Sequence, residues 1–156
     1  MSGVVTLRTA GASDADAIRD LTREAYARWV DLLGREPLPM TVDYTQALLR
    51  HRFDLLYADG VLAALIETTP QGEDLLIENV AVRPSFQGRG YGVRLVTLAE
   101  DMAARAGLAG TRLYTNQRFA ENIRLYASLG YMTEREEALN GGVAVHMRKP
   151  LRPVPG

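Results

Sequence analysis

The sequence predicts an α/β fold, with one domain over residues 1–150 and a flexible tail at 151–156. The first observation is composition: of 156 residues, 47% are hydrophobic and 24% are charged, as in ordinary globular domains with a single core. The second is the order of periodic segments, which reads β-α-α-β-β-β-α-β-α-β-β. The third is a helix between the fourth and fifth strands, which predicts that these two strands are parallel.

The first third of the chain is expected to hold a strand and two helices. After a strand at 4–8, Ser13 is expected to cap a helix that ends at Gly34. Thr41 is expected to cap a shorter helix that ends near Arg50. The first helix carries apolar side chains at helical spacing, namely Ile18, Leu21, Ala25, Trp29 and Leu32.

A hairpin and a central strand follow. Asp59-Gly60 is a strong hairpin signal, so the segments 55–58 and 61–68 are expected to pair. Residues 70–72 predict the next turn, and 75–82 the fourth strand. The remaining elements are a helix to about residue 106, a strand at 111–115, a helix at 119–129, and strands at 131–136 and 143–149 that pair across 140–142.

The most informative segment is residues 80–92, in which an apolar strand leads into glycines that open an amphipathic helix. Glycine lets the backbone come close to a ligand. The first turn of a helix offers unpaired N–H groups and a partial positive charge, and Arg89 adds a cation within the turn. These features predict a site for a phosphate or pyrophosphate.

Two common phosphate motifs do not fit this segment. A Walker A loop needs a lysine after its last glycine, and none is present. The Rossmann fingerprint needs Gly-x-Gly-x-x-Gly and an acid at the end of the next strand, whereas the glycines here stand at 88, 90 and 92.

Composition excludes several other classes. The net charge is −1 and no Lys/Arg-rich run occurs, which argues against a nucleic-acid partner. The absence of cysteine excludes disulfides, thiolate metal sites and a cysteine nucleophile. No metal site is expected, because His51 and His146 lack metal-ligand spacing and are expected to be structural. Without a signal peptide or an apolar run of membrane-spanning length, the expected location is the cytoplasm and no membrane partner is expected.

Two segments together resemble the GNAT superfamily of acetyl-CoA-dependent N-acetyltransferases. The first, Gln87-Gly88-Arg89-Gly90-Tyr91-Gly92, is similar to motif A of that family, Gln/Arg-x-x-Gly-x-Gly/Ala. The second runs from Asn122 to Tyr131 and contains the motif B core Tyr-x-x-x-Gly-Phe/Tyr. The resemblance implies a mixed, mostly antiparallel sheet of about seven strands, with parallel, splayed strands 4 and 5 and four flanking helices. It also implies acetyl-CoA as cofactor and a primary amine as acceptor.

The resemblance assigns catalytic roles. Tyr126 stands where the family often has the general acid that protonates the departing thiolate. Glu78 is a candidate general base, with Tyr114 and water as alternatives. A backbone N–H of Val80 or Val82 is expected to polarise the thioester carbonyl. The structural alternatives are a core tyrosine at 126 and a salt-bridged glutamate at 78.

Further positions are expected to bind the two substrates. The asparagine that is usual in the family would fall at Phe119, so Asn116 and Asn122 are candidates in its place. The expected cofactor contacts are Val80, Ala81, Val82, Gln87, Gly88, Arg89, Gly90, Tyr91, Gly92, Asn116, Asn122 and Tyr126. The expected acceptor contacts are Trp29, Glu36, Met40, Tyr44 and Tyr114. Glu36, Asp31 and Asp43 could attract a cationic amine or simply form a solvated charged face.

Two functional alternatives remain open. A domain that binds acyl-CoA without turnover, as a sensor or within an assembly, would carry the same cofactor motif. A nucleic-acid-binding module is disfavoured by the net charge. The partners expected are a small-molecule or peptide amine and a second copy of the chain in a homodimer.

Overall fold

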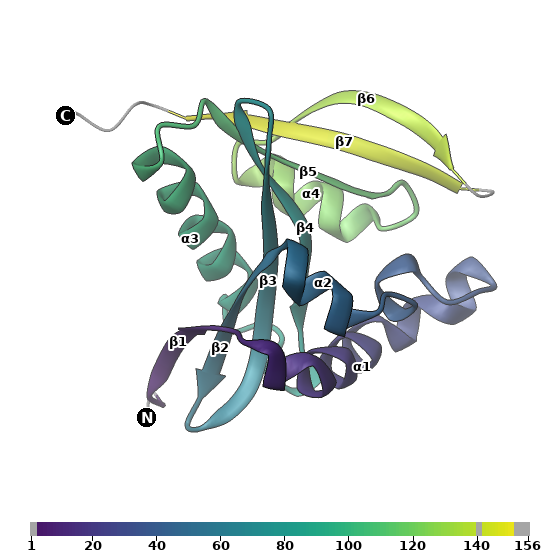
Figure 1. Ribbon diagram of the computed structural model, residues 1–156. Coiled ribbons are helices and arrows are strands. Elements are labelled where there is room, and N and C mark those ends of the chain that lie inside the picture. The colour runs from purple at the N-terminus through teal and green to yellow at the C-terminus, as the bar shows by residue number, and fades with distance from the viewer. Residues whose placement is uncertain (1–2, 140–141, 152–156) are drawn as a thin grey trace. The chain divides into compact units, whose positions relative to one another are not determined.

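The computed structural model describes residues 3–139 and 142–151 (Figure 1). Its strands are β1 Val5–Thr9, β2 Arg52–Ala58, β3 Val61–Gln71, β4 Asp74–Val82, β5 Gly110–Asn116, β6 Met132–Leu139 and β7 Gly142–Pro150. Its α-helices are α1 Ala15–Leu33, α2 Tyr44–Arg50, α3 Tyr91–Arg105 and α4 Ala120–Ser128. Three short 3₁₀ helices, which the sequence patterns did not predict, are η1 Ala12–Asp14, η2 Leu38–Met40 and η3 Pro84–Phe86.

The sheet confirms the predicted fold class. Neighbouring strands are hydrogen-bonded in the order β1-β2-β3-β4-β5-β7-β6. β4 and β5 are parallel, with a register that joins Asp74–Ile77 to Gly110–Leu113. Both strands continue past this register, to Val82 and Asn116. The parallel pairing therefore covers only the first part of each strand, as the predicted splay requires.

The chain forms two compact units. The first unit comprises Met1–Thr69 and Asn79–Thr97, and the second Pro70–Glu78 and Leu98–Gly156. The boundaries fall within three elements: in β3 between Thr69 and Pro70, in β4 between Glu78 and Asn79, and in α3 between Thr97 and Leu98. The single domain predicted over 1–150 stays a prediction.

The core of the first unit forms where α1 and α2 bury their apolar sides against β2, β3 and β4. One face of α1 contributes apolar side chains at helical spacing, and packing against the strands removes these side chains from water. The buried cluster consists of Ile18, Leu21, Ala25, Tyr44, Ala47, Phe53, Leu55, Leu62, Leu65 and Ala81. Of the predicted apolar stripe, Trp29 is half-buried and Leu32 is exposed, so the second half of α1 contributes less to this core.

The second unit is held by a sheet and by a charged network within it. β7 pairs antiparallel with both β5 and β6, and β6 lies beside β7 as a long ribbon (Figure 1). The carboxylate of Asp74 is 3% exposed and accepts hydrogen bonds from Arg112 Nε at 2.8 Å and from Arg148 Nε and Nη2, both at 2.9 Å. These bonds connect β4, β5 and β7. The two guanidiniums, Arg148 foremost, lower the pKa of the Asp74 carboxyl.

Turns agree with the predictions at some positions and differ at others. Asp59 and Gly60 both have positive φ, 49° and 80°, as the predicted tight hairpin requires. The turn predicted at 70–72 begins later, because β3 continues to Gln71. The final hairpin forms as expected, but residues 140–141 of its turn and 152–156 of the tail lie outside the described residues.

Two helix caps were predicted wrongly. Asp43, not Thr41, caps α2: its Oδ1 accepts hydrogen bonds from the N–H groups of Thr45 and Gln46. The Thr41 hydroxyl instead donates a hydrogen bond to the Leu38 carbonyl at the end of η2. Ser13 lies inside η1, and α1 begins at Ala15 with Asp14 as its N-cap residue, one residue later than a Ser13 cap predicts. None of the described helices is both long and apolar enough to cross a membrane.

Candidate functional site

The segment that leads into the glycine turn is anchored by Arg83. Its backbone N–H donates to the Ala63 carbonyl at 2.8 Å, and its Nε donates to the Leu62 carbonyl at 3.0 Å. Its guanidinium also pairs with Glu24 on α1. Sequence reasoning did not assign Arg83 a role, although its place at the end of an apolar strand was a signal. The residue fixes the start of the turn against β3 and α1.

The turn itself has the conformation that glycine allows. Gly88 and Gly90 have φ of 82° and 80°, which side chains of L-residues rarely adopt. A Cβ at either position would meet no heavy atom within 4 Å among the described residues, so both backbones face open space. The first α3 hydrogen bond runs from Arg94 N–H to the Gly90 carbonyl, and the N–H groups before it lie at the helix start. The geometry fits a phosphate held by backbone donors.

The strand residues ahead of the turn divide between two faces of β4. Ala81 is 2% exposed and belongs to the core cluster with α1. Val80 and Val82 are half-buried, and a Cβ on Gly92 would lie 4.0 Å and 3.6 Å from their side chains. Gly92 therefore packs the start of α3 against these two valines. This packing sets the height of the helix start above the strand.

The side chains of the turn pack on one another. The Arg89 guanidinium lies 5.0 Å from the centre of the Phe86 ring, a cation–π contact, and the Tyr91 ring lies 6.3 Å from the same ring. Gln87 is exposed, and its Nε2 donates to the Val82 carbonyl at 3.3 Å. The Arg89 cation is exposed beside the glycines, where it can meet an anion.

The second unit places Glu78 and Tyr114 in contact. The Tyr114 hydroxyl donates to Oε2 of Glu78 at 2.9 Å, and Glu78 is half-buried. Next to this pair, the Tyr114 ring lies 5.8 Å from the ring of His146, whose Nε2 is 3.0 Å from Glu137 Oε1. Two of the sequence-predicted site residues are thus joined by a hydrogen bond.

Tyr126 lies on α4 of the second unit. Its ring meets that of Tyr131 edge-on, at 6.0 Å between centres. Within the described part of the chain, the Tyr126 hydroxyl has no hydrogen-bond partner. Burial raises the pKa of the Tyr126 phenol to about 12, so this group keeps its proton at neutral pH. The phenol is therefore in the protonated form that a general acid requires.

The two candidate asparagines differ in their bonding. Asn116 ends β5, and its Oδ1 accepts from the Arg118 N–H at 2.9 Å, so its side chain shapes the turn before α4. Asn122 is half-buried, and its side chain makes no hydrogen bond within the described residues. Asn122 does not cap α4, whose N-cap residue is Phe119.

The expected acceptor contacts of the first unit fall into two groups. Met40 and Tyr44 are 8% and 3% exposed, and the Tyr44 hydroxyl donates to the Pro39 carbonyl at 2.6 Å. Burial raises the pKa of Tyr44 to about 12. Glu36 is exposed, and its carboxylate lies 3.4 Å from the guanidinium of Arg23. Trp29 is half-buried, and the Arg28 guanidinium lies 4.4 Å from the centre of its ring. Met40 and Tyr44 thus serve the core whether or not they also shape a site.

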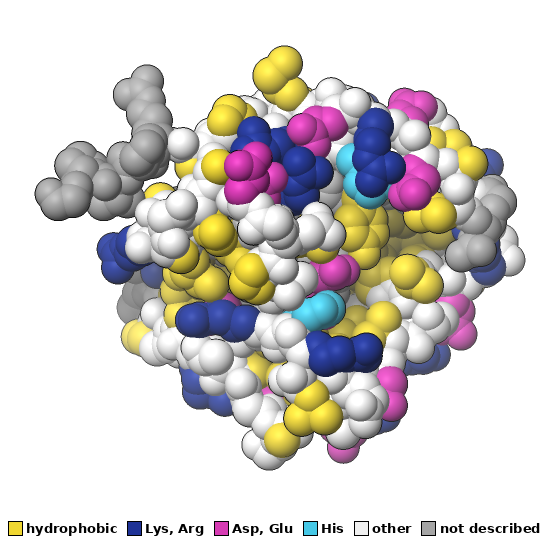
Figure 2. Space-filling model, turned by 45° about the horizontal axis from the view of Figure 1, so that its top comes forward, with side chains coloured by type: hydrophobic (Ala, Val, Ile, Leu, Met, Phe, Trp, Pro, Cys, Tyr) yellow, Lys and Arg dark blue, Asp and Glu magenta, His cyan; other side chains and the backbone are white. Residues whose placement is uncertain are grey.

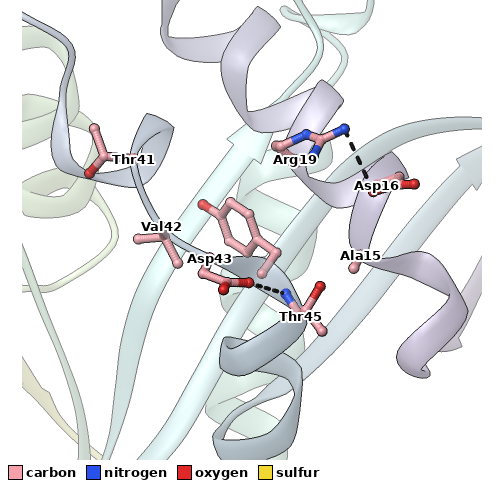
Figure 3. Close-up of a pocket in the computed structure, with 8 residues that line it drawn as sticks. Ala15, Asp16, Arg19, Thr41, Val42, Asp43 and Thr45 are labelled. Atoms are coloured by element: carbon pink, nitrogen blue, oxygen red, sulfur yellow. Dashed lines mark hydrogen bonds and ion pairs between the residues drawn. The ribbon is translucent and has the colours of Figure 1, made fainter.

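A shallow pocket of about 360 Å³ lies on the first unit, where α1 and α2 begin (Figure 3). Its lining is Ala15, Asp16, Arg19, Thr41, Val42, Asp43, Tyr44 and Thr45. Figure 3 shows its two marked contacts: Arg19 with Asp16, at 3.6 Å, and Asp43 with the Thr45 N–H, at 3.0 Å. Asp43, one of the carboxylates considered for attracting an amine, is therefore engaged in capping α2.

Charge is mixed on one face of the molecule (Figure 2). On the face shown in Figure 2, acidic and basic side chains are interspersed, in keeping with the net charge of −1. This distribution gives no field of one sign on that face to attract a polyanion.

Two polar pairs of the first unit were not foreseen. The Tyr26 hydroxyl donates to Asn79 Oδ1 at 2.6 Å, and His51 Nδ1 lies 2.6 Å from the buried Glu67 Oε2. The partners are 53 and 16 residues apart, so periodicity could not pair them. A polar residue within an apolar strand run was the available signal at positions 67 and 79.

Sequence and structure comparisons agree on one family. The model described as "Acetyltransferase (GNAT) family" matches residues 15–131, a range that contains the glycine turn and Tyr126. No curated protein matches the sequence.

Solved structures share the fold at low identity. The ribosomal-protein-S18-alanine N-acetyltransferase of Escherichia coli matches with a TM-score of 0.79 and 22% identity, over 98% of this chain and 97% of its own. The PaiA N-acetyltransferase of Thermoplasma acidophilum, solved with coenzyme A, matches with a TM-score of 0.80 and 16% identity, over 94% and 99%. YncA of Salmonella typhimurium, solved with its cofactor acetyl-CoA, matches with a TM-score of 0.71 and 22% identity, over 95% and 94%.

Proposed function

The chain belongs to the acetyltransferase (GNAT) family and is an acyltransferase, and from this premise we propose that it transfers the acetyl group of acetyl-CoA to a primary amine. The observation that carries the proposal is the glycine turn. Gly88 and Gly90 hold left-handed backbone in open space at the start of α3. That geometry suits the pyrophosphate of a CoA molecule. Coenzyme A and acetyl-CoA are bound in two solved structures of the same fold.

The binding roles follow from the residues of the turn. Backbone N–H groups of residues 87–92 would donate to the pyrophosphate oxygens, and Arg89 would add charge to the same group. Any residue other than glycine at 88 or 90 would strain the positive φ and place a side chain where the phosphate lies. A backbone N–H of Val80 or Val82 would polarise the thioester carbonyl.

The transfer needs two proton movements. The amine nitrogen forms a bond to the thioester carbonyl carbon, and the carbon–sulfur bond breaks. In our proposal Glu78 accepts the proton that the amine loses, directly or through water. Tyr126 donates its phenolic proton to the departing sulfur. The positive charge that develops on the amine nitrogen and the negative charge that develops on the sulfur are thus both neutralised. Direct attack by the amine requires no acyl-enzyme.

Two observations favour this division of roles. The Glu78 carboxylate accepts a hydrogen bond from the Tyr114 hydroxyl, which holds the carboxylate in one orientation. Tyr114 is therefore its positioning residue in this proposal. Tyr126 is protonated at neutral pH and its hydroxyl is free within the described residues, so its proton is available. Trp29 and Glu36 of the first unit stay proposed acceptor contacts.

The absence of cysteine allows a clean test. A thiol reagent in solution will report only the CoA that is released, because the chain itself has no thiol to react. Acetyl-CoA is mixed with the protein and with a panel of primary amines, and thiol release is followed over time. We expect amine-dependent release with at least one panel member, together with the acetylated amine by mass spectrometry. Saturable binding of acetyl-CoA without release for any amine would instead indicate a non-catalytic acyl-CoA sensor.

A further inference from the structure

Four polar side chains form a row across the strands of the second unit. The row starts at Glu78 of β4, which accepts the hydrogen bond from Tyr114 of β5. Tyr114 is the cross-strand partner of His146 in β7, and the two rings lie 5.8 Å apart between centres. His146 in turn contacts Glu137 of β6. All four residues belong to the second unit, so the row runs from the proposed base to a second carboxylate within that unit.

The histidine of this row presents a basic nitrogen. Its Nε2 lies 3.0 Å from Oε1 of Glu137. A carboxylate only accepts hydrogen bonds, so Nε2 carries the proton of the neutral ring and Nδ1 keeps a lone pair. Within residues 3–139 and 142–151, no hydrogen bond reaches this Nδ1. The side chain is 17% exposed and Nδ1 is not among the buried atoms that lack a partner, so the lone pair is open to solvent.

The charged groups around His146 favour a proton on its ring. Arg135, its cross-strand partner in β6, lies 3.8 Å from the same oxygen of Glu137. Arg148 follows two positions later on the same face of β7, but its guanidinium is bonded to Asp74. Glu137 is therefore the charged group that touches the ring among the described residues. A carboxylate on one imidazole nitrogen orients the ring and stabilises its protonated form.

An acceptor amine has two protons to lose in the proposed reaction. At neutral pH a basic amine is an ammonium ion, which has no lone pair with which to attack. One proton must leave before the nitrogen bonds to the thioester carbon, and another leaves as the amide forms. Glu78 is proposed to accept the second proton, so the first needs another acceptor. Histidine is the side chain best suited to accept a proton near neutral pH.

We propose that Nδ1 of His146 accepts the first proton from the ammonium form of the acceptor, directly or through one water molecule, and that Glu137 is its positioning residue. The nitrogen–hydrogen bond of the ammonium breaks, its electron pair stays on the amine nitrogen, and the hydrogen bonds to Nδ1. Solvent then removes the proton from the imidazolium. This step suits strongly basic amines as acceptors. The inference rests on the proposed function, because it adds a step to that reaction.

The tautomer of His146 can be tested without any substrate. The chain has two histidines, and each meets a carboxylate through a different nitrogen. His146 uses Nε2, whereas His51 of the first unit uses Nδ1, 2.6 Å from Glu67 Oε2. Long-range proton–nitrogen NMR at about pH 9, above the range in which histidine titrates, should show opposite tautomers for the two rings. His51→Gln assigns the signals. A proton on Nδ1 of neutral His146 would overturn the inference.

Two amines of different basicity test the proton transfer. Ethylamine, like lysine, is an ammonium ion at about pH 8, whereas its fluorine atoms leave trifluoroethylamine neutral. Thiol release from acetyl-CoA gives kcat/KM for each amine. His146→Phe keeps a ring beside Tyr114 but has no nitrogen, so we expect a loss of about 100-fold with ethylamine and little loss with trifluoroethylamine. Glu78→Gln should lose activity with both amines, because the second proton must leave in either case.

Variants of β6 separate the positioning role from general effects of charge. Glu137→Gln still offers an oxygen to Nε2 but lacks the charge that favours an imidazolium, so it should show a smaller loss, again with ethylamine alone. Glu136→Gln, the same change at the exposed neighbouring position, is the control and should keep both rates.

Equal losses with both amines in His146→Phe would make the role of the ring structural and would overturn the inference, as would no loss with either. Wild-type use of trifluoroethylamine alone, or of neither amine, would also overturn it. The NMR comparison uses the wild type, so it applies even if His146→Phe does not fold. Failure of the proposed function has a different signature, namely no CoA binding and no acetyl-CoA-dependent thiol release with any amine.

Discussion

The hydroxyl of Tyr114 donates a 2.9 Å hydrogen bond to Glu78, which joins β5 to β4 one residue beyond the last parallel pair, Ile77 with Leu113. The strands stop pairing there, so the side chains make the connection in place of the backbone. The contact holds the Glu78 carboxylate in one orientation. A carboxylate fixed in this way is prepared to accept a proton.

Glu78→Gln is therefore expected to lower kcat by about 100-fold, the usual size of a general-base contribution. The amide keeps an acceptor for Tyr114 and a similar shape, so the Michaelis constant for acetyl-CoA should not change. Steady-state kinetics with a saturating amine measures both quantities. Tyr114→Phe should produce a smaller loss, because the carboxylate remains but is less well oriented. Unchanged turnover in Glu78→Gln would assign the proton to water.

The phenol of Tyr126 leads to a prediction about pH. Because burial raises its pKa to about 12, the group stays protonated through the ordinary assay range. If Tyr126 is the general acid, its deprotonation should not cause kcat to fall between about pH 8 and pH 10, where a phenol with an ordinary pKa near 10 would begin to lose its proton. A pH–rate profile at saturating substrates tests this. An alkaline limb near 10 that disappears in Tyr126→Phe would contradict the raised pKa.

Replacing the phenol tests its role directly. Tyr126→Phe is expected to lower kcat by about 100-fold, with the affinity for acetyl-CoA retained. Tyr131→Phe is the matched control, because Tyr131 contacts the Tyr126 ring but its hydroxyl bonds to Thr111 at 2.7 Å and Glu100 at 2.9 Å. The control should lose stability in thermal unfolding and keep kcat. Equal kcat values for the two variants would remove Tyr126 from the mechanism.

The buried carboxylate of Asp74 predicts how stability depends on pH. Arg148 and Arg112 lower its pKa, so the folded chain binds this proton less readily than the unfolded chain. The stabilisation is complete above the ordinary Asp pKa of about 3.9 and is lost as the pH falls through the lowered value. Urea unfolding at a series of pH values should show this loss below about pH 4.

Asp74→Asn should remove that dependence. At pH 7 the variant is expected to lose about 3 kcal/mol of unfolding free energy, because two partly buried guanidiniums lose their counter-charge. The difference from wild type should shrink as the pH falls. Asp16→Asn is the control: Asp16 is 88% exposed and 3.6 Å from Arg19, so stability should not change. A constant difference between Asp74→Asn and wild type down to pH 2 would contradict the assigned pKa direction.

Local signals in the sequence predicted the parts of the fold that depend on neighbouring residues. Glycine at 88 and 90, and Asp59-Gly60 in the hairpin, are positions where the backbone needs positive φ, and the structure has it there. The strand–helix–strand order was sufficient to predict that β4 and β5 are parallel. The cap of α2 was missed because Thr41 and Asp43 are both suitable residues and η2, which Thr41 ends, was not foreseen.

Contacts between distant segments were beyond the reach of periodicity. Glu78 and Tyr114 were both named as candidates, but their hydrogen bond depends on the β4–β5 register. The Tyr26–Asn79 and His51–Glu67 pairs were missed for the same reason. Met40 and Tyr44 were named as acceptor contacts, and in the structure both side chains are buried in the first unit. The expected homodimer and cytoplasmic location stay predictions.

The most direct test of the central claim is a thermal-unfolding titration with acetyl-CoA. Wild type is compared with Gly90→Glu and with Gly34→Glu, a control at a glycine with similar φ of 71° and equally open space. A ligand at 100 times its Kd stabilises a folded chain by about 2.7 kcal/mol. We predict a saturable rise in Tm for wild type and Gly34→Glu, and none for Gly90→Glu. No rise in wild type, or an equal rise in Gly90→Glu, would contradict the assignment of residues 87–92 to acetyl-CoA.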